Sequence, residues 1–232
     1  PGPDDQLSVT LPQPEDDNKT QALANEFISR SLTQVIAEGI TGGRSLDDIA
    51  RDTTQLQTYV AKLGQERLLD KVIPPESREF AISSDNSAES VKKYFNTITQ
   101  IYISNFSKIE SDLQILHLAA TGNNPKALRR LDVNIAALEN TIAEIKKTPV
   151  PTKWLEFAKN DAWYLLKTLT AVKIIRNSEV DPVASLLILQ DRVQLTEERR
   201  DFYLKTRAEL SAAGITFAQN EPAAGLLLQG LQ

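Results

Sequence analysis

Apolar residues recur every three or four positions along most of the chain, the spacing that places side chains on one face of an α-helix. Segments containing glycine or proline separate these stretches. The pattern predicts helices over about 20–40, 45–68, 86–120, 125–147, 152–176 and 182–213. We therefore expect an all-α protein, a multi-helix bundle of about six helices with antiparallel helical hairpins.

A stiff corner separates two of the expected helices. Pro149 and Pro151 remove two backbone donors, and each proline pushes the residue before it toward an extended conformation. Because the connection is short, the helices on either side are expected to be antiparallel neighbours. Thr152 is expected to cap the second of these helices.

The stretch after Pro75 is expected to form the centre of the core. Residues 79–83 alternate loosely between apolar and polar, which indicates a short extended piece. Asn86, with Glu89 three positions later, resembles a helix cap. The apolar stripe that follows, from Val91 to Leu116, is wide enough to be buried on more than one side.

The two ends of the chain differ from its centre. Residues 1–19 are rich in proline and in acidic residues, so we expect a flexible acidic tail there. Residues 20–217 are expected to form the helical bundle domain, and residues 218–232 a C-terminal tail. Leu226, Leu227 and Leu228 in that tail either dock on the bundle or form an interaction peptide.

The charge distribution argues against nucleic acid as a partner. The 31 acidic and 26 basic residues are mixed along the helices without a basic stripe. No stretch reaches the roughly 18 consecutive apolar residues of a membrane span. Since the sequence contains no methionine, Pro1 is not a translation start. We therefore expect membrane contact only through an N-terminal anchor that this sequence does not contain.

Few residues suit catalysis or metal binding. The sequence has no cysteine and a single histidine, His117, which lacks the histidine or cysteine partners of a zinc site. No Glu-x-x-His unit of the kind that holds two metals in a helical bundle occurs, and Gly42-Gly43 is too short for a phosphate-binding loop. We expect no catalytic residue, metal or cofactor, and interpret His117 as structural.

Aromatic residues gather after the proline corner. Trp154, Phe157, Trp163 and Tyr164 fall on one expected helix. Large aromatic side chains at helix contacts are more often part of a core than of a ligand cage. If some of them are exposed, these four residues form the candidate binding surface of the protein.

Three short segments resemble a known family. They are residues 82–96 (ISSDNSAESVKKYFN), 148–154 (TPVPTKW) and 181–186 (DPVASL). In this order and separation they are similar to a family of uncharacterised, all-helical extracytoplasmic proteins from candidate-phyla-radiation bacteria (Patescibacteria). The resemblance covers residues 20–217 and implies a domain outside the cytoplasmic membrane. Family members typically begin with a hydrophobic segment, which this sequence does not show, and no catalytic residue is carried over.

These features favour a non-enzymatic structural or protein-interaction module of the bacterial cell envelope. Its partner is expected to be another envelope protein. Because several apolar seams in one chain tend to close on each other, we expect a monomer or a weak dimer. Two alternatives stay open: a small-molecule or peptide-binding domain that uses the aromatic helices, and a hydrolase of envelope polymers that acts through carboxylates.

Overall fold

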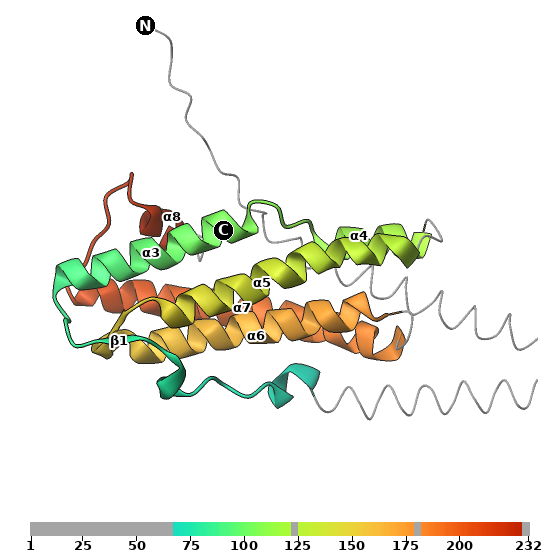
Figure 1. Ribbon diagram of the computed structural model, residues 1–232, viewed down its shortest axis with the longest axis horizontal. Helices are drawn as coiled ribbons and strands as arrows, with labels where there is room; N and C mark the ends of the chain where they lie inside the picture. The colour runs from blue at the N-terminus through green and yellow to red at the C-terminus, as the bar shows by residue number, and fades with distance from the viewer. Residues whose placement is uncertain (1–66, 122–124, 179–181, 229–232) are drawn as a thin grey trace, which may run out of the picture.

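The computed structural model describes residues 67–121, 125–178 and 182–228 (Figure 1). Regular structure in these ranges is almost entirely helical, which confirms the predicted all-α bundle. The α-helices are α3 (Ala88–Phe106), α4 (Asp112–Thr121), α5 (Leu131–Lys147), α6 (Leu155–Arg176), α7 (Pro182–Ala212) and α8 (Pro222–Leu228). The 3-10 helices are η1 (Leu68–Lys71), η2 (Ser77–Glu79), η3 (Pro125–Arg130) and η4 (Thr152–Trp154), and the strands are β1 (Ile82–Ser83) and β2 (Val150–Pro151).

Several predictions fall outside these ranges. The acidic tail over 1–19, the helix over 20–40, Gly42-Gly43 and all but the last two residues of the helix over 45–68 precede the first described residue, Arg67. Within the described part of the chain, no helix is long and apolar enough to cross a lipid bilayer.

Helices α5 and α7 both pack against α6, and α3 packs against α5 (Figure 1). The helices meet through fully buried apolar side chains on their facing stripes. These include Phe95 and Ile98 on α3, Leu131 and Ile145 on α5, Leu165 and Ile175 on α6, and Ile188 and Leu210 on α7. Helices α3 and α4 contribute to the same core cluster as α6, and the expectation that the 86–120 stretch is its centre stays a prediction.

The predicted helix over 86–120 is two helices. Helix α3 ends at Phe106 and α4 begins at Asp112. The Asn134 side chain on α5 donates to the backbone carbonyl of Glu110 at 2.7 Å and accepts from its amide at 3.3 Å. Ser111 then accepts from the amide of Gln114, as helix-capping hydroxyls do. The side chain of a distant helix therefore stabilises a break that periodicity alone did not reveal.

Two predicted helix caps have other roles. Ser87, not Asn86, caps α3, since its hydroxyl accepts from the amide of Ser90 at 3.2 Å. The Asn86 side chain instead accepts from the backbone amide of Lys153 at 2.9 Å. Thr152 begins η4 rather than α6, and its hydroxyl donates to the carbonyl of Ser83 at 2.9 Å. Both side chains therefore connect the start of α3 to the proline corner.

The proline corner is a turn between antiparallel neighbours, as predicted. It also pairs with the extended piece predicted over 79–83, because β1 and β2 form a two-stranded parallel sheet. Ala81 donates to the carbonyl of Lys146, and Val150 donates back to the carbonyl of Ala81, both at 2.9 Å. The corner is thus fixed by backbone bonds as well as by its prolines.

Helix α7 ends as its sequence predicts. Gly214 has a φ of 70°, a left-handed conformation that glycine adopts without strain. The amide of Gly214 bonds to the carbonyl of Ser211 and the amide of Ile215 to that of Leu210, the pattern of a Schellman cap. The chain then returns to α3, where α8 packs (Figure 1). Asn96 of α3 accepts from the amide of Ala223 at 3.0 Å.

The segment before η2 crosses the outside of the bundle. We call residues 67–73 the strap. It includes η1 and lies along α6 and α7, where the teal segment runs in Figure 1. Leu69 is fully buried there, whereas Ile73 is 81% exposed. The strap is therefore anchored to the bundle through Leu69, whereas the side chain of Ile73 at its end faces solvent.

Candidate functional site

The four aromatic residues of the candidate binding surface are packed into the bundle to different depths. Phe157 is buried and lies nearly parallel to Phe202 of α7, with ring centroids 5.2 Å apart. Trp154 is half-buried and meets Phe95 of α3 edge to face at 5.1 Å. These two residues therefore connect α6 to α7 and to α3, respectively.

Trp163 and Tyr164 lie on the part of α6 that the strap and α7 cover. The indole nitrogen of Trp163 donates to the backbone carbonyl of Val72 in the strap at 2.7 Å. The ring of Tyr164 lies 5.3 Å from that of Phe202. Both residues are half-buried. The four aromatics thus contribute to packing, and their role as a binding surface stays a prediction.

A fully buried carboxylate lies between three helices. Asp161 of α6 has no exposed surface. One of its oxygens accepts from Tyr102 of α3 at 2.8 Å and from Tyr203 of α7 at 2.6 Å. The Arg199 guanidinium lies over the rings of both tyrosines, 5.6 Å and 5.4 Å from their centroids, and donates to the Tyr203 hydroxyl at 3.3 Å. We call these four residues the Asp161 network.

Burial controls the ionisation of the Asp161 network. It raises the pKa of the Asp161 carboxyl above its usual value, although Arg199 and the two tyrosine hydrogen bonds act in the opposite direction. Burial and the facing carboxylate also raise the pKa of Tyr102 and Tyr203. Both hydroxyls therefore stay neutral at physiological pH and remain hydrogen-bond donors to Asp161.

Some polar atoms in this region have no protein partner. The second oxygen of Asp161, the Nε of Arg199 and the nearby hydroxyl of Tyr94 are buried without a hydrogen bond to any described residue. The Asp161 carboxylate contributes to raising the pKa of Tyr94, after burial itself. Unpaired buried groups are uncommon in folded proteins, so this network is the most unusual polar feature of the described core.

Sequence reasoning missed Asp161, although a signal was present. The residue follows Phe157 and precedes Leu165 by four positions each, so it falls on the apolar stripe of its helix. A charged residue in such a position must be paired or neutralised when buried. Its partners lie on other helices, and no local pattern in the sequence identifies them.

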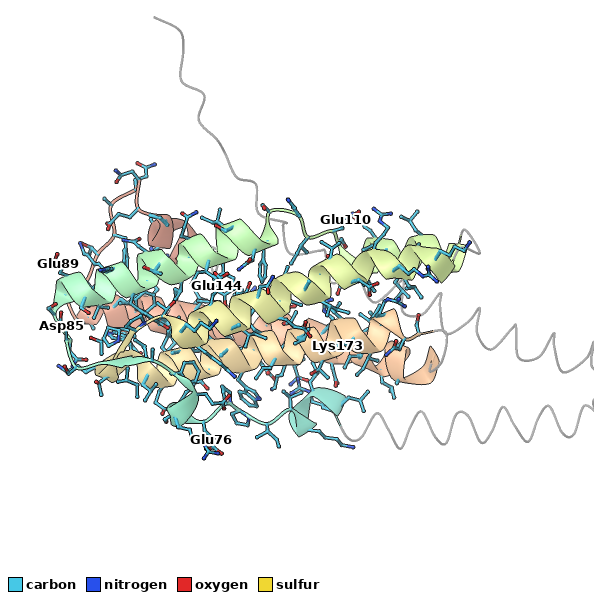
Figure 2. The ribbon with its side chains drawn as sticks, viewed as in Figure 1. Glu76, Asp85, Glu89, Glu110, Glu144 and Lys173 are labelled. Atoms are coloured by element: carbon cyan, nitrogen blue, oxygen red, sulfur yellow. The ribbon has the colours of Figure 1, made fainter. Side chains whose placement is uncertain are left out.

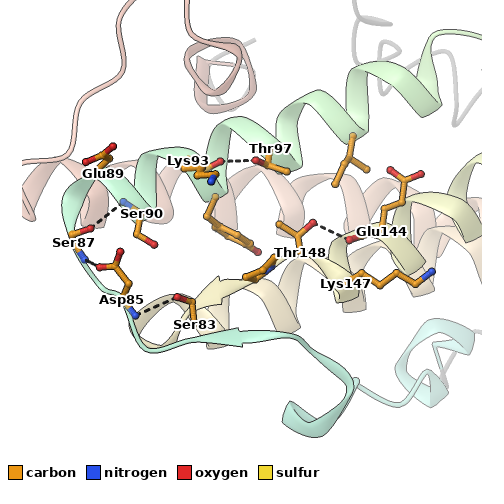
Figure 3. Close-up of a pocket in the computed structure, with 13 residues that line it drawn as sticks. Ser83, Asp85, Ser87, Glu89, Ser90, Lys93, Thr97, Glu144, Lys147 and Thr148 are labelled. Carbon is orange, nitrogen blue, oxygen red and sulfur yellow. Dashed lines mark hydrogen bonds between the residues drawn. The ribbon is translucent and has the colours of Figure 1, made fainter.

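A surface cleft of about 800 Å³ lies between the first half of α3 and the end of α5 (Figure 3). One wall comprises the 83–87 loop and α3, including Glu89 and Lys93. The other comprises Glu144, Lys147 and the proline corner. Tyr94 also lines the cleft. Charges of both signs and several hydroxyls are therefore available to a polar ligand, without one dominant sign.

Several serine and threonine hydroxyls of the cleft already have local partners. Dashed lines in Figure 3 join Ser87 to the amide of Ser90, and Thr97 and Thr148 to carbonyls one helical turn earlier. Such bonds stabilise helix ends and turns. The cleft is therefore a recess whose lining is organised by the fold, and its hydroxyls keep acceptor lone pairs free for a ligand.

Metal and histidine chemistry find little support in the described residues. Across 67–121, 125–178 and 182–228, no three histidine or acidic side chains gather so as to hold a metal ion. His117 belongs to α4, but its side chain lies outside what the structure describes. Its interpretation as a structural histidine stays a prediction.

Fold and site together define an all-helical bundle with a buried carboxylate–tyrosine–arginine network and a shallow polar cleft. Comparison of the chain with protein-family models, with curated proteins and with solved structures finds no match.

Proposed function

We propose that the chain is a non-enzymatic helical module, with a structural or protein-interaction role in the bacterial cell envelope. The observation that carries this proposal is the use of buried polar groups to join helices. Tyr102, Asp161 and Tyr203 belong to α3, α6 and α7 and bond to one another in the core. Hydrogen bonds in the low-dielectric core are electrostatically stronger than in water, so these bonds hold the three helices together. A rigid bundle presents a constant outer surface to a partner.

The outer surface of the bundle suits a polar, mixed-charge contact. Charged side chains such as Glu110 and Lys173 point away from the helices in Figure 2, and many form exposed pairs with neighbouring helices. Lys173 of α6, for example, contacts Glu139 of α5 at 2.8 Å. Such surfaces select partners through charge complementarity more than through apolar area.

The location outside the cytoplasm rests on the resemblance of the 82–96, 148–154 and 181–186 segments to an extracytoplasmic family. An anchor upstream of Pro1, another envelope protein as partner, and a monomer or weak dimer belong to the same proposal. Fractionation of the source cells with an antibody to this domain tests the location. Recovery in the cytosolic fraction alone would overturn this part of the proposal.

Affinity capture from detergent-solubilised envelope membranes tests the interaction role. The bait is the folded chain, compared with two variants that reverse exposed charges on different faces. One carries Glu139→Lys and Glu144→Lys on α5, and the other Arg200→Glu and Lys205→Glu on α7. We expect a specific partner to be lost with one variant and kept with the other. Equal recovery with all three baits would show that the captured proteins bind nonspecifically.

The cleft beside α3 favours a second candidate, a small-molecule or peptide-binding domain. This alternative was expected to use the aromatic helices, and the observed cleft is lined by Tyr94 of α3 but by none of the four residues of the candidate binding surface. Ligand screening by NMR tests this candidate, with the changes in amide chemical shift mapped onto residues 83–101 and 144–149. Shifts confined to those residues would support it, and their absence across a library of polar metabolites and short peptides would remove it.

A further inference from the structure

We propose that the strap, residues 67–73, opens as a local unit and that its opening uncovers the Trp163 face of α6. This inference is independent of the proposed function, because it concerns the stability of one segment against the rest of the bundle. It rests on how the strap is attached, on the charges buried beneath it and on the residues that it covers.

The attachment of the strap is sparse. Leu69 is its one fully buried side chain, and the Leu69 amide donates to the Asp191 carboxylate of α7 at 3.1 Å. At its other end, the carbonyl of Val72 accepts from Trp163. Two further backbone bonds, from Asp70 to Arg67 and from Val72 to Leu69, are internal to the strap. Segments with few bonds to the rest of a protein open at lower free energy than its core.

The boundary between the strap and the fixed chain is well defined. Pro74 and Pro75 follow Ile73 and have no backbone donor. Pro75 is buried, and soon after it Glu79 contacts Lys146 of α5 at 2.6 Å, and Ala81 joins the backbone of the same residue. Residues from Pro75 onward are therefore held, and rotation near Pro74 suffices to release the strap.

The charges beneath the strap are poorly paired. The side chain of Lys167 is only 3% exposed, yet its nearest carboxylates, Glu198 and Asp70, are 3.9 and 4.0 Å away. Arg67 contacts Glu198 at 2.8 Å, but its Nε and second terminal nitrogen are buried without a hydrogen bond to any described residue. A buried ammonium without a close acceptor, such as that of Lys167, is costly. Opening returns it to water and so offsets part of the contacts that are lost.

Trp163 gives the opening a direct consequence. Its indole is held between the Val72 carbonyl of the strap and the Lys167 ammonium, which lies 3.9 Å from the ring centroid. Release of the strap exposes this ring, one of the four aromatics expected from the sequence to form a binding surface. The closed strap thus masks part of that surface.

Hydrogen–deuterium exchange of the full chain tests the proposal. We expect the amides of Leu69 and Val72 to exchange at least about 100-fold faster than those at the centre of α5 and α6, with little dependence on denaturant, as local opening requires. If these amides exchange only together with the core and with the same denaturant dependence, the strap is part of the cooperative unit and the proposal fails.

Matched variants identify the cause. Lys167→Met removes the buried ammonium and is expected to slow strap exchange roughly tenfold, since an apolar side chain of similar length replaces a poorly paired charge. Lys173→Met, on the exposed side of α6, is the control and should leave strap exchange unchanged. Equal effects of the two variants, or faster strap exchange in Lys167→Met, would overturn the proposed role of the buried charge.

A second readout follows Trp163 itself. In a Trp154→Phe background, Trp163 is the one remaining tryptophan, so acrylamide quenching of its fluorescence measures its exposure. Leu69→Ala removes the anchor and should raise quenching while the far-ultraviolet circular dichroism stays that of the parent. If the variant folds and Trp163 stays protected, the strap does not open as a unit.

Discussion

The core and the strap both bury charged side chains, but the two regions satisfy them to different degrees. In the core, Asp161 accepts two hydrogen bonds below 3 Å from donors that stay neutral. Beneath the strap, the described carboxylate nearest to the Lys167 ammonium lies 3.9 Å away. Removal of a charge from water is thus compensated more fully in the core than beneath the strap.

This difference separates what holds the bundle together from what can move. A buried charge is strongly destabilising when one partner is removed, and well-packed apolar replacements of poorly paired charges are often neutral or stabilising. We therefore expect substitutions in the Asp161 network to weaken the whole fold. Substitutions beneath the strap should act locally. They should either stabilise the protein or destabilise it much less.

The largest effect is expected for Asp161→Ala. The substitution leaves the hydroxyls of Tyr102 and Tyr203 without their acceptor and removes the carboxylate that faces Arg199. We expect the free energy of unfolding to fall by about 3–5 kcal/mol, measured by urea denaturation. Glu139→Ala, at an exposed pair with Lys173, is the control and should change stability by less than about 0.5 kcal/mol. Similar losses for both variants would contradict the central role of the network.

The clearest comparison is between Arg199 and Lys167, each replaced by methionine. Arg199→Met removes the cation that lies over both tyrosine rings and should destabilise the fold by about 2–4 kcal/mol. Lys167→Met should leave global stability unchanged or raise it by up to about 1 kcal/mol. Thermal and urea unfolding of the two variants at one pH measures the difference. Equal destabilisation would mean that the two buried charges are compensated alike.

The helical architecture could be predicted because it depends on local signals. Alternating spacings of three and four placed Leu165 and Ile145 on facing stripes, two prolines fixed the corner, and Gly214 marked the end of α7. Each signal lies within one turn of the element it defines. Errors arose where a distant residue decides local structure, as when Asn134 of α5 stabilises the break after α3.

The candidate site could not be predicted to the same extent. The aromatic residues of α6 were visible in the sequence, but their division between core contacts and the strap depends on α3, α7 and residues 67–73. Asp161 was detectable as a charge on an apolar stripe, whereas its two tyrosine partners come from helices 59 and 42 residues away. Tertiary hydrogen bonds of this kind have no periodic signature.

A smaller effect should appear in the pH dependence of stability. Because the pKa of Asp161 is raised in the folded state above its usual 3.8, its contribution to stability is fully present below the unfolded value and is lost as pH rises through the folded value. Asp161→Asn keeps an acceptor oxygen and does not titrate. The stability of the parent relative to this variant should therefore decline as the pH rises above about 4 toward the pKa of the folded state.

Urea denaturation of both proteins across this range measures the difference. A constant difference would mean that the carboxyl titrates alike in the folded and unfolded states. A difference that grows in favour of the parent with rising pH would mean that Arg199 and the tyrosines outweigh burial. In that case the network would stabilise the ionised form of Asp161 in the folded protein.

The smallest effect is expected for Trp163→Phe, which tests the strap side of the comparison. The substitution removes the indole donor to the Val72 carbonyl while keeping an aromatic ring, and should cost about 1 kcal/mol. Trp154→Phe loses similar area without such a bond among the described residues, so it is the matched control. If the strap is a separate unit, Trp163→Phe accelerates exchange of the Leu69 and Val72 amides but leaves the urea midpoint of the core unchanged. If the loss of global stability equals the loss of local stability calculated from strap exchange, the two regions unfold together. A local bond can alter global unfolding only when the segment that it holds unfolds with the rest.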